Sequence, residues 1–211
     1  MATDPTLIYH ITHKDNLGRI LSNGGLVAQS QISKTDLTYC NIAHNSIQDR
    51  RSQKSVPCGP KGCLHDYVPF YFAPRSPMLY AIRMGNVSDC TAGQSDIVYL
   101  VSSAQRVKAA SIEFVFADGH GIMAFSEFFD DLKDLDAVDW DIMSETYWTD
   151  TLEDPDRKRR RQAEFLVYQR FPWTLIEEIA VMDSHVESEV KTMILRASHK
   201  PPVIIRQAWY Y

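Results

Sequence analysis

The segment 162–168 reads Gln162-Ala163-Glu164-Phe165-Leu166-Val167-Tyr168, and five consecutive basic residues, Arg157-Lys158-Arg159-Arg160-Arg161, come directly before it. The apolar run predicts a β-strand. Because side chains alternate between the two faces of a strand, Glu164 shares its face with Leu166 and Tyr168 and lies on no evidently solvated stripe. A partly desolvated carboxylate near a cleft can stabilise a developing cation, so Glu164 is a candidate catalytic acid. The alternative is a strand-end glutamate paired with one of the upstream arginines.

The basic run concentrates positive charge in a chain whose net charge is −5. The overall charge therefore gives no sign of nucleic-acid binding, and any contact with DNA or RNA has to rest on a local patch such as residues 157–161. We expect a polyanion-contacting loop here, leading into the strand of Glu164. A solvated surface face is the common alternative for a run of this kind.

The chain has 211 residues, of which 45% are hydrophobic and 23% charged, and this composition is ordinary for a globular protein with a substantial core. Neither a repeat nor a low-complexity linker divides it, so we expect one domain over 1–211. The polar N-terminus is not typical of a signal peptide, and no apolar stretch approaches a membrane span, so we expect a cytoplasmic protein with no membrane partner. The four cysteines are expected to be reduced thiols, and their spacing does not favour zinc.

Short strands mixed with helices, without a βαβ rhythm, predict an α+β fold. Strands are expected at Leu7–Ile11, Tyr67–Phe72, Asp96–Ser102, Phe114–Ala117, Ala163–Arg170, Glu177–Met182 and Val203–Trp209. Helices or helical turns are expected at Asn16–Ser22, His44–Arg51, Ser76–Met84, Met123–Val138 and Val186–Ala197. Thr12 is expected to open a capping box before the first helix, which stops at Gly24-Gly25. Pro69 suggests that its strand is an edge strand or is bent.

Polar side chains in three further places are candidate functional groups. In Tyr9-His10-Ile11-Thr12, the imidazole and the hydroxyl share one strand face just before a helix, where they could hold ribose or amide groups. In Asp118-Gly119-His120-Gly121, the flanking glycines indicate close backbone approach and a loop-borne histidine. A structural strand histidine and an exposed turn histidine are the respective alternatives. Arg50 and Arg51 carry little weight alone, because arginine pairs are common on helix surfaces.

Several motifs of common enzyme classes do not occur in the sequence. It contains no glycine-rich dinucleotide fingerprint, no phosphate loop, no H-E-x-x-H and no G-x-S-x-G. A hydride-transfer Rossmann enzyme, a nucleotide triphosphatase and a serine hydrolase are therefore poor fits. No carboxylate cluster suitable for two metal ions stands out, which disfavours a nuclease.

Six blocks of sequence combine into a recognisable order. They are Tyr9-His10-Ile11-Thr12-His13 with Asn16-Leu17, Ile47-Gln48-Asp49-Arg50-Arg51, Leu64-His65-Asp66-Tyr67-Val68-Pro69-Phe70-Tyr71-Phe72, Arg75-Ser76-Pro77-Met78-Leu79-Tyr80, Gln162-Ala163-Glu164-Phe165-Leu166-Val167 and Trp209-Tyr210-Tyr211. In this order they closely resemble the DarT family. The resemblance runs from residue 6 to 211, and the number of matching blocks makes it specific.

The resemblance implies an ADP-ribosyltransferase-like fold, with two packed β-sheets, flanking helices and NAD⁺ in the cleft between the sheets. It implies a toxin of a bacterial toxin–antitoxin pair that transfers ADP-ribose from NAD⁺ to a thymine base in single-stranded DNA and so blocks replication. NAD⁺ would be the co-substrate, and no metal would be needed. The implied protein partner is DarG, a macrodomain antitoxin that removes the mark and also binds the toxin.

The resemblance also implies roles for individual residues. Glu164 matches the catalytic glutamate of the family, Arg51 its catalytic arginine, and His120 a histidine that helps to order the site. In the chemistry that this implies, the carboxylate stabilises the positive charge that cleavage of the nicotinamide–ribose bond leaves on the sugar. The guanidinium stays protonated and is a poor base, but it could stabilise the thymine anion. The sequence leaves open whether Glu164 or water accepts the thymine proton.

The binding residues are carried over in the same way. His10 and Thr12 match the part of the first strand that holds the nicotinamide end of NAD⁺, and Tyr71 and Met78 fall in the block that walls the pocket. Residues 142–163 would form a substrate-recognition loop. The side chains in it that are available to DNA are Tyr147, Trp148, Arg157, Arg159 and Arg160.

Two other functions stay open on the sequence alone. One is an ADP-ribosyltransferase that acts on protein or RNA, and the other is a catalytically silent module that binds NAD or ADP-ribose. The preferred base context, the oligomeric state and the source organism are not decided by the sequence.

Overall fold

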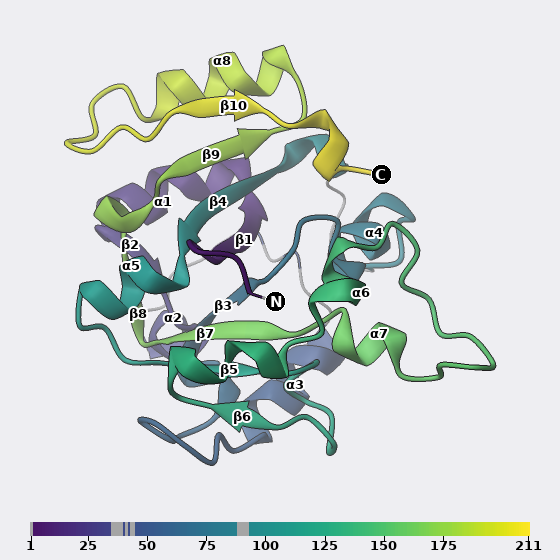
Figure 1. Ribbon diagram of the computed structural model, residues 1–211. Helices are drawn as coiled ribbons and strands as arrows, with labels where there is room; N and C mark the ends of the chain where they lie inside the picture. Colours follow the sequence, from purple (N-terminus) through teal and green to yellow (C-terminus); the bar gives the residue numbers. More distant parts are fainter. Residues whose placement is uncertain (1, 35–39, 41, 43–44, 88–92) are drawn as a thin grey trace.

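A computed structural model describes residues 2–34, 40, 42, 45–87 and 93–211, and it confirms the α+β class (Figure 1). The main sheet has eight strands in the order β10-β9-β4-β1-β3-β7-β5-β6, and β2 and β8 form a second, two-stranded sheet. The strands are β1 (Leu7–His13), β2 (Gly25–Val27), β3 (Tyr67–Tyr71), β4 (Ile97–Ser103), β5 (Phe114–Ala117), β6 (Phe128–Phe129), β7 (Glu164–Tyr168), β8 (Arg170–Pro172), β9 (Glu178–Val181) and β10 (Val203–Ile205). Neighbouring strands are antiparallel apart from β9 and β10, which are parallel.

Short helices surround the main sheet, and Figure 1 shows α8 lying along β10 at the end of the molecule opposite α3 and β6. The helices are α1 (Leu17–Ser22), α2 (Gln29–Lys34), α3 (Asn45–Gln53), α4 (Pro77–Arg83), α5 (Ala104–Ala109), α6 (Trp140–Ser144), α7 (Arg157–Arg160) and α8 (Ser184–Met193). The predicted end of the first helix is confirmed, because α1 stops just before Gly24, whose φ of 70° is left-handed. The helical turn expected at His44–Arg51 is found as α3; His44 itself lies outside the described residues.

The main sheet is nearly divided between β1 and β3. β1 pairs with β4 through seven residues and β3 pairs with β7 through five, but β1 and β3 share only the pair Tyr9↔Tyr71. The expectation of two packed sheets is therefore wrong in this form. The two halves, β10-β9-β4-β1 and β3-β7-β5-β6, stay joined by one point of pairing, and the separate sheet is the small β2–β8 pair.

Pro69 lies in the interior of this sheet, since β3 has β1 on one side and β7 on the other. Of the two alternatives expected for this strand, an edge position or a bend, the edge position is wrong, but its physical basis holds. In an antiparallel strand the N–H and C=O of one residue point the same way. The carbonyl of Pro69 lies 2.8 Å from Nδ1 of His10, so the position that lacks an N–H faces the open part of the sheet next to β1.

Several other predicted elements differ from the structure. The strand expected at Val203–Trp209 ends at Ile205, and Gln207–Trp209 form a 3-10 helix. Thr12 does not open a capping box, because β1 continues to His13, whose ring accepts the backbone N–H of Asp15 instead. The helix expected at Met123–Val138 is wrong: this segment holds β6 and a 3-10 helix. Pairing of β6 with β5, and stacking of Phe129 on Phe116 with ring centroids 5.2 Å apart, override the helical pattern.

The predicted strand around Glu164 is confirmed as β7, which is buried on both faces. Phe165 and Val167 are fully buried in the larger apolar cluster, whereas Leu166 packs on the opposite face with Val115 and other residues. Each such side chain contributes about 1.5–3 kcal/mol to folding. The packing fixes β7 in register and so fixes where Glu164 points, toward the face of Leu166.

Candidate active site

Glu164 is the first residue of β7 and is almost excluded from water, with 3% of its surface exposed. Its strand neighbours are Tyr71 on β3 and Ala117 on β5, so the glutamate is set in the middle of a paired sheet. One of its oxygens, Oε2, accepts a hydrogen bond of 2.7 Å from Nη1 of Arg51, which is also buried and comes from α3. The sheet and the helix thus bring together two candidates that are 113 residues apart in sequence.

The second oxygen of Glu164 is held by the segment between β5 and β6. Oε1 accepts the backbone N–H of Gly121 at 2.9 Å and lies 3.2 Å from Nδ1 of His120. A Cβ atom at position 121 would lie 3.2 Å from Oε1 and equally close to a methyl group of Leu64, so glycine permits this close approach. The three candidate catalytic residues therefore meet at one carboxylate.

The environment of Glu164 keeps it ionised. Burial by itself raises the pKa of a carboxyl, but Arg51, His120 and the N–H of Gly121 together outweigh it and lower the pKa of Glu164 to about 2. A carboxylate with this pKa is fully charged at neutral pH. A fixed negative charge in a dry site is suited to stabilising a cation.

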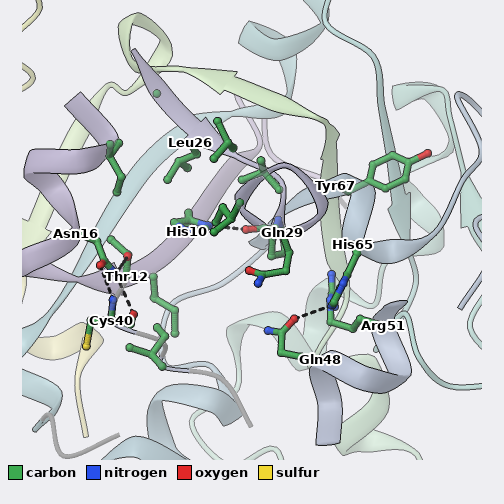
Figure 2. Close-up of a pocket in the computed structure, with 18 of the residues that line it drawn as sticks. His10, Thr12, Asn16, Leu26, Gln29, Cys40, Gln48, Arg51, His65 and Tyr67 are labelled. Atoms are coloured by element: carbon green, nitrogen blue, oxygen red, sulfur yellow. Dashed lines mark hydrogen bonds between the residues drawn. The ribbon is translucent and has the colours of Figure 1, made fainter. Parts of the chain in front are cut away.

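A pocket next to this group lies between β1, β3, α1, β2 and α3. Its lining includes all four residues expected to bind the cofactor, His10, Thr12, Tyr71 and Met78, together with Arg51. Glu164 and His120 are not among the residues that line it; Arg51 lies between the pocket and the carboxylate. Figure 2 shows His10, Thr12 and Arg51 around the same cavity.

His10 lies in this pocket as a neutral ring. Burial lowers the pKa of His10 to about 4, only partly offset by its contact with the carbonyl of Pro69. At neutral pH the ring therefore donates its Nδ1 proton to that carbonyl, and Nε2 is left as an acceptor. Tyr71 and Met78 form another wall, where the phenol donates to the thioether sulfur at 3.6 Å.

Two polar features of the pocket were missed by the sequence interpretation. Nδ2 of Asn16 donates to the hydroxyl of Thr12 at 3.1 Å and to the carbonyl of Cys40 at 3.0 Å, so it orients Thr12 (Figure 2). Gln48, one turn before Arg51 on α3, contacts Nε2 of His65 at 3.0 Å. The position of Asn16 and Gln48 in the matching blocks was the available signal, but Cys40 and His65, their partners, are 24 and 17 residues away in the sequence.

Arg51 also has a donor to spare. Within the described ranges, its Nη2 atom is buried and has no hydrogen-bond partner. An unsatisfied buried donor is costly, at about 1–3 kcal/mol, and an acceptor on a substrate in the pocket would remove that cost. Arg51 thus fits a site that is completed by a ligand carrying acceptor oxygens or a negative charge.

The two aromatic residues proposed for DNA differ sharply in their surroundings. Tyr147 is 82% exposed, whereas Trp148 is 8% exposed and donates from Nε1 to the hydroxyl of Tyr211 at 2.9 Å. The Trp148 ring also contacts the edge of Tyr80. Tyr147 thus presents an exposed ring, whereas Trp148 is packed into the fold.

The basic run does not form the expected loop, because residues 157–160 make the single turn α7. Arg159 pairs with Asp118 and Asp156, and Arg160 pairs with Asp139 and Asp154. The other members of the run are less compensated. Arg157 has one ion pair, at 4.0 Å, and the exposed Lys158 has no ion pair with the described carboxylates.

Among the residues with assigned positions, no three His, Cys, Asp or Glu side chains come together as a metal ion would require. In the same part of the chain, no helix is both long and apolar enough to cross a membrane.

Residues 9–211 match the family model of DarT, described as ssDNA thymidine ADP-ribosyltransferase. The chain belongs to the DarT family. A DNA ADP-ribosyl transferase of Thermus sp. strain 2.9 is 48% identical over 210 residues, which is 99% of this chain and 97% of that protein. A DNA ADP-ribosyl transferase of Escherichia coli is 33% identical over 205 residues, covering 97% of this chain and 93% of that protein.

Solved DarT structures confirm the fold. The structure of Thermus sp. 2.9 DarT in complex with ADP-ribosylated ssDNA superposes with a TM-score of 0.93 at 46% identity, covering 100% of this chain and 99% of that one. The same DarT in complex with NAD⁺ gives a TM-score of 0.88 at 44% identity and covers both chains fully. A more distant relative from Thermosipho africanus, 26% identical over 89% of this chain, is a fusion of a DNA ADP-ribosyl transferase with a DNA ADP-ribosyl glycohydrolase. As a DarT, the chain is an ADP-ribosyltransferase of thymidine in single-stranded DNA.

Proposed function

We propose that the chain works as one domain, 1–211, which binds NAD⁺ in the pocket beside Arg51 and transfers its ADP-ribose to thymine. The observation that carries this proposal is the convergence of Arg51, His120 and Gly121 on the carboxylate of Glu164. The whole-chain likeness to a DarT that was solved with NAD⁺ supports the choice of donor.

In the reaction, the bond between nicotinamide and the ribose carbon breaks, and the bonding electrons leave with nicotinamide. The sugar becomes positively charged, and the ionised Glu164 stabilises that charge from a fixed position. The low pKa of Glu164 matters here, because a protonated carboxyl would supply no charge. Removal of one such electrostatic contact typically slows an enzyme about a hundredfold to a thousandfold.

The ring nitrogen of thymine loses its proton, to Glu164 or to a water molecule, as it bonds to the ribose carbon. Arg51 cannot accept that proton, because a guanidinium stays protonated in proteins. Its role is to stabilise the thymine anion, and the unpartnered Nη2 atom is the donor available for this. His120 orients Glu164 through the contact of 3.2 Å.

The nicotinamide end of NAD⁺ lies against β1 and β3 in this proposal. His10 offers Nε2 as an acceptor for an amide N–H, and Thr12 is held by Asn16 so that its hydroxyl can contact the amide or ribose. Tyr71 and Met78 provide an aromatic and a thioether wall for the flat nicotinamide ring.

Single-stranded DNA suits this chemistry, because the reacting nitrogen of thymine is occupied by base pairing in a duplex. We place Tyr147 under a base, since its exposed ring can stack. Arg157, Arg159, Arg160 and Lys158 form the basic surface near the phosphates. The ion pairs of Arg159 and Arg160 reduce what they can give to DNA, so Arg157 and Lys158 are the main phosphate contacts.

The biological role that we infer is that of a toxin whose DNA mark blocks replication. A partner of the DarG kind, which removes ADP-ribose from DNA, would complete the pair. Support comes from the Thermosipho africanus relative, in which a transferase and a DNA ADP-ribosyl glycohydrolase share one chain.

The test is to incubate the purified protein with NAD⁺ and matched oligonucleotides that contain or lack thymine, and to look for an ADP-ribose adduct by mass spectrometry. We expect an adduct only on the thymine-containing strand and none with Glu164→Ala. An adduct on RNA or protein instead would favour the other transferase function. If the variant forms as much adduct as the original chain, Glu164 is not the catalytic residue; NAD⁺ binding without any adduct would indicate a silent binding module.

A further inference from the structure

Among the four residues of α7, Arg159 has the least exposed side chain. Its Nη1 atom donates to both carboxylate oxygens of Asp118, at 3.0 and 3.1 Å, and to the hydroxyl of Ser126 at 3.3 Å. Its Nε and Nη2 atoms donate to Asp156 at 2.8–3.0 Å. Only 12% of the side chain is exposed, so the three nitrogens of the guanidinium are all engaged.

The backbone of Arg159 holds the same segment as its side chain does. Its carbonyl accepts the N–H of His120 at 3.0 Å, and Ser126 donates to the carbonyl of His120 at 2.8 Å. The backbone at Gly119 lies directly against the guanidinium, because a Cβ atom there would be 2.3 Å from Nη1. The segment 118–126 is therefore wrapped around Arg159.

This segment is the one that presents two groups to the catalytic carboxylate. His120 and Gly121 both contact Oε1 of Glu164. The other oxygen is held independently by Arg51 from α3. Two of the three contacts that fix the carboxylate of Glu164 thus depend on where the 118–126 segment lies.

We propose that Arg159 is a positioning residue of the transferase, which holds His120 and Gly121 against Glu164. The inference rests on the proposed catalytic role of Glu164. A phosphate contact is the competing role for Arg159, but a phosphate would have to displace Asp118 or Asp156 from a bidentate contact. Arg157 and Lys158 are better placed for phosphate, because Arg157 has one ion pair, at 4.0 Å, and Lys158 has none with the described carboxylates.

Loss of this tie has a signature in the pH dependence. The charged and titratable groups that face Glu164 are Arg51 from α3, His120 from the 118–126 segment and Tyr71 from β3. Loosening the segment removes the hydrogen bonds by which His120 and Gly121 stabilise the ionised carboxylate, and leaves only the ion pair with Arg51. The pKa of Glu164 then moves up from about 2 toward its ordinary value of 4.5, and activity falls off at a higher pH on the acid side.

The experiment compares Arg159→Met and Arg159→Lys with Glu164→Gln and with the surface variant Arg106→Met, whose original side chain pairs with Glu177 far along the chain. Lysine keeps the charge but cannot make the hydrogen bonds of the guanidinium with both Asp118 and Asp156. For both Arg159 variants we expect kcat for thymine modification to fall by about ten- to a hundredfold, because the carboxylate is misplaced. The KM for NAD⁺ and the affinity for a thymine oligonucleotide should change by less than about threefold, and the acid limb should move up in pH.

Each outcome bears on the proposal. The proposal is overturned if Arg159→Met keeps the original kcat and pH profile. It is also overturned if Arg159→Met instead binds the oligonucleotide more weakly and with a shallower salt dependence, because Arg159 would then be a phosphate contact. If Arg159→Met does not fold, Asp118→Asn cuts the same tie more mildly and has to show the same pH shift. Full activity of Glu164→Gln would instead overturn the proposed function, whatever the Arg159 variants do.

Discussion

Nη1 of Arg51 donates to Oε2 of Glu164 across 2.7 Å, and each side chain is less than one-tenth exposed. The pair joins the helix α3 to the first residue of β7, 113 positions away in the sequence. Because both charges are buried, each is tolerable only in the presence of the other. The active site is therefore also a determinant of stability.

Arg51→Leu should lower the free energy of unfolding by about 3–5 kcal/mol, because it leaves the Glu164 carboxylate buried without its partner. The double variant Arg51→Leu/Glu164→Leu should recover much of that loss, since no charge is then stranded. Urea unfolding measures both. Arg106→Leu, which breaks an exposed pair with Glu177, is the control and should cost no more than about 1 kcal/mol. Equal losses in the single and double variants would contradict the stranded-charge explanation.

The stability of the protein should fall on mild acidification because of His10. Its pKa is about 4 in the folded chain and 6.5 when unperturbed, so between these values the unfolded chain binds the extra proton. This contribution to stability is complete above pH 6.5 and is lost as the pH falls toward 4, with a slope of at most about 1.4 kcal/mol per pH unit. Urea unfolding at a series of pH values measures the slope.

His10→Gln should flatten the dependence between pH 6.5 and 4, whereas the exposed His185→Gln should leave it unchanged. Glu164 acts in a separate window, since its pKa is lowered from 4.5 to about 2 and its contribution is lost only as the pH falls below 4.5. If the slope between pH 6.5 and 4 is the same in His10→Gln as in the original chain, another group is responsible.

The sequence predicted the chemistry better than the architecture. Alternation along the strand indicated that Glu164 was shielded, and the family blocks assigned the four pocket residues that the structure brings together. The contact of Glu164 with Arg51 was not predictable from local pattern, because it joins residues 113 positions apart. The strand that carries Pro69 looked like an edge strand. Its local sequence does not show that β1 and β3 pair at a single point, which leaves the Pro69 position facing β1 without a need for a backbone N–H.

Trp148 illustrates the same limit. Because Trp148 lies next to Tyr147 in a polar loop, it looked equally available to DNA. Its indole N–H in fact donates to the hydroxyl of Tyr211, 63 residues further along the chain. The segment after Met123 has the spacing of an amphipathic helix, yet pairing with β5 determines its structure. Local periodicity fails wherever a distant strand or ring supplies the stronger contact.

The two neighbouring aromatic residues should respond to substitution in opposite ways. Tyr147→Ala should weaken binding of a thymine oligonucleotide by about 1–3 kcal/mol through loss of stacking, with unchanged thermal stability. Tyr147→Phe keeps the ring and should bind normally. Trp148→Ala should instead lower stability by about 3–5 kcal/mol, because it empties a buried site. Fluorescence anisotropy and thermal unfolding separate the two effects, and an affinity loss confined to Trp148→Ala would reverse the assignment.

The basic run should contribute to DNA binding unevenly. Each phosphate contact that is lost lowers the slope of log affinity against log salt by about 0.7 for a single strand. Neutralising Arg157, Arg159 and Arg160 together should weaken binding and flatten this slope while NAD⁺ binding is kept. Since Arg159 and Arg160 are already paired with aspartates, most of the change in slope should come from Arg157. Lys158→Gln alone should lower the slope by the full amount of one phosphate contact, about 0.7.

Anisotropy titrations of a fluorescent thymine oligonucleotide over a range of salt concentrations test this order of effects. Lys191→Gln on α8 is the matched control, because it removes one exposed cation at the end of the molecule away from α7 (Figure 1). An unchanged slope both in the triple variant and in Lys158→Gln would exclude residues 157–160 from phosphate binding. A larger change of this slope for Arg159→Met than for Lys158→Gln would mean that DNA takes the guanidinium from Asp118 and Asp156, and it would contradict the positioning role proposed for Arg159.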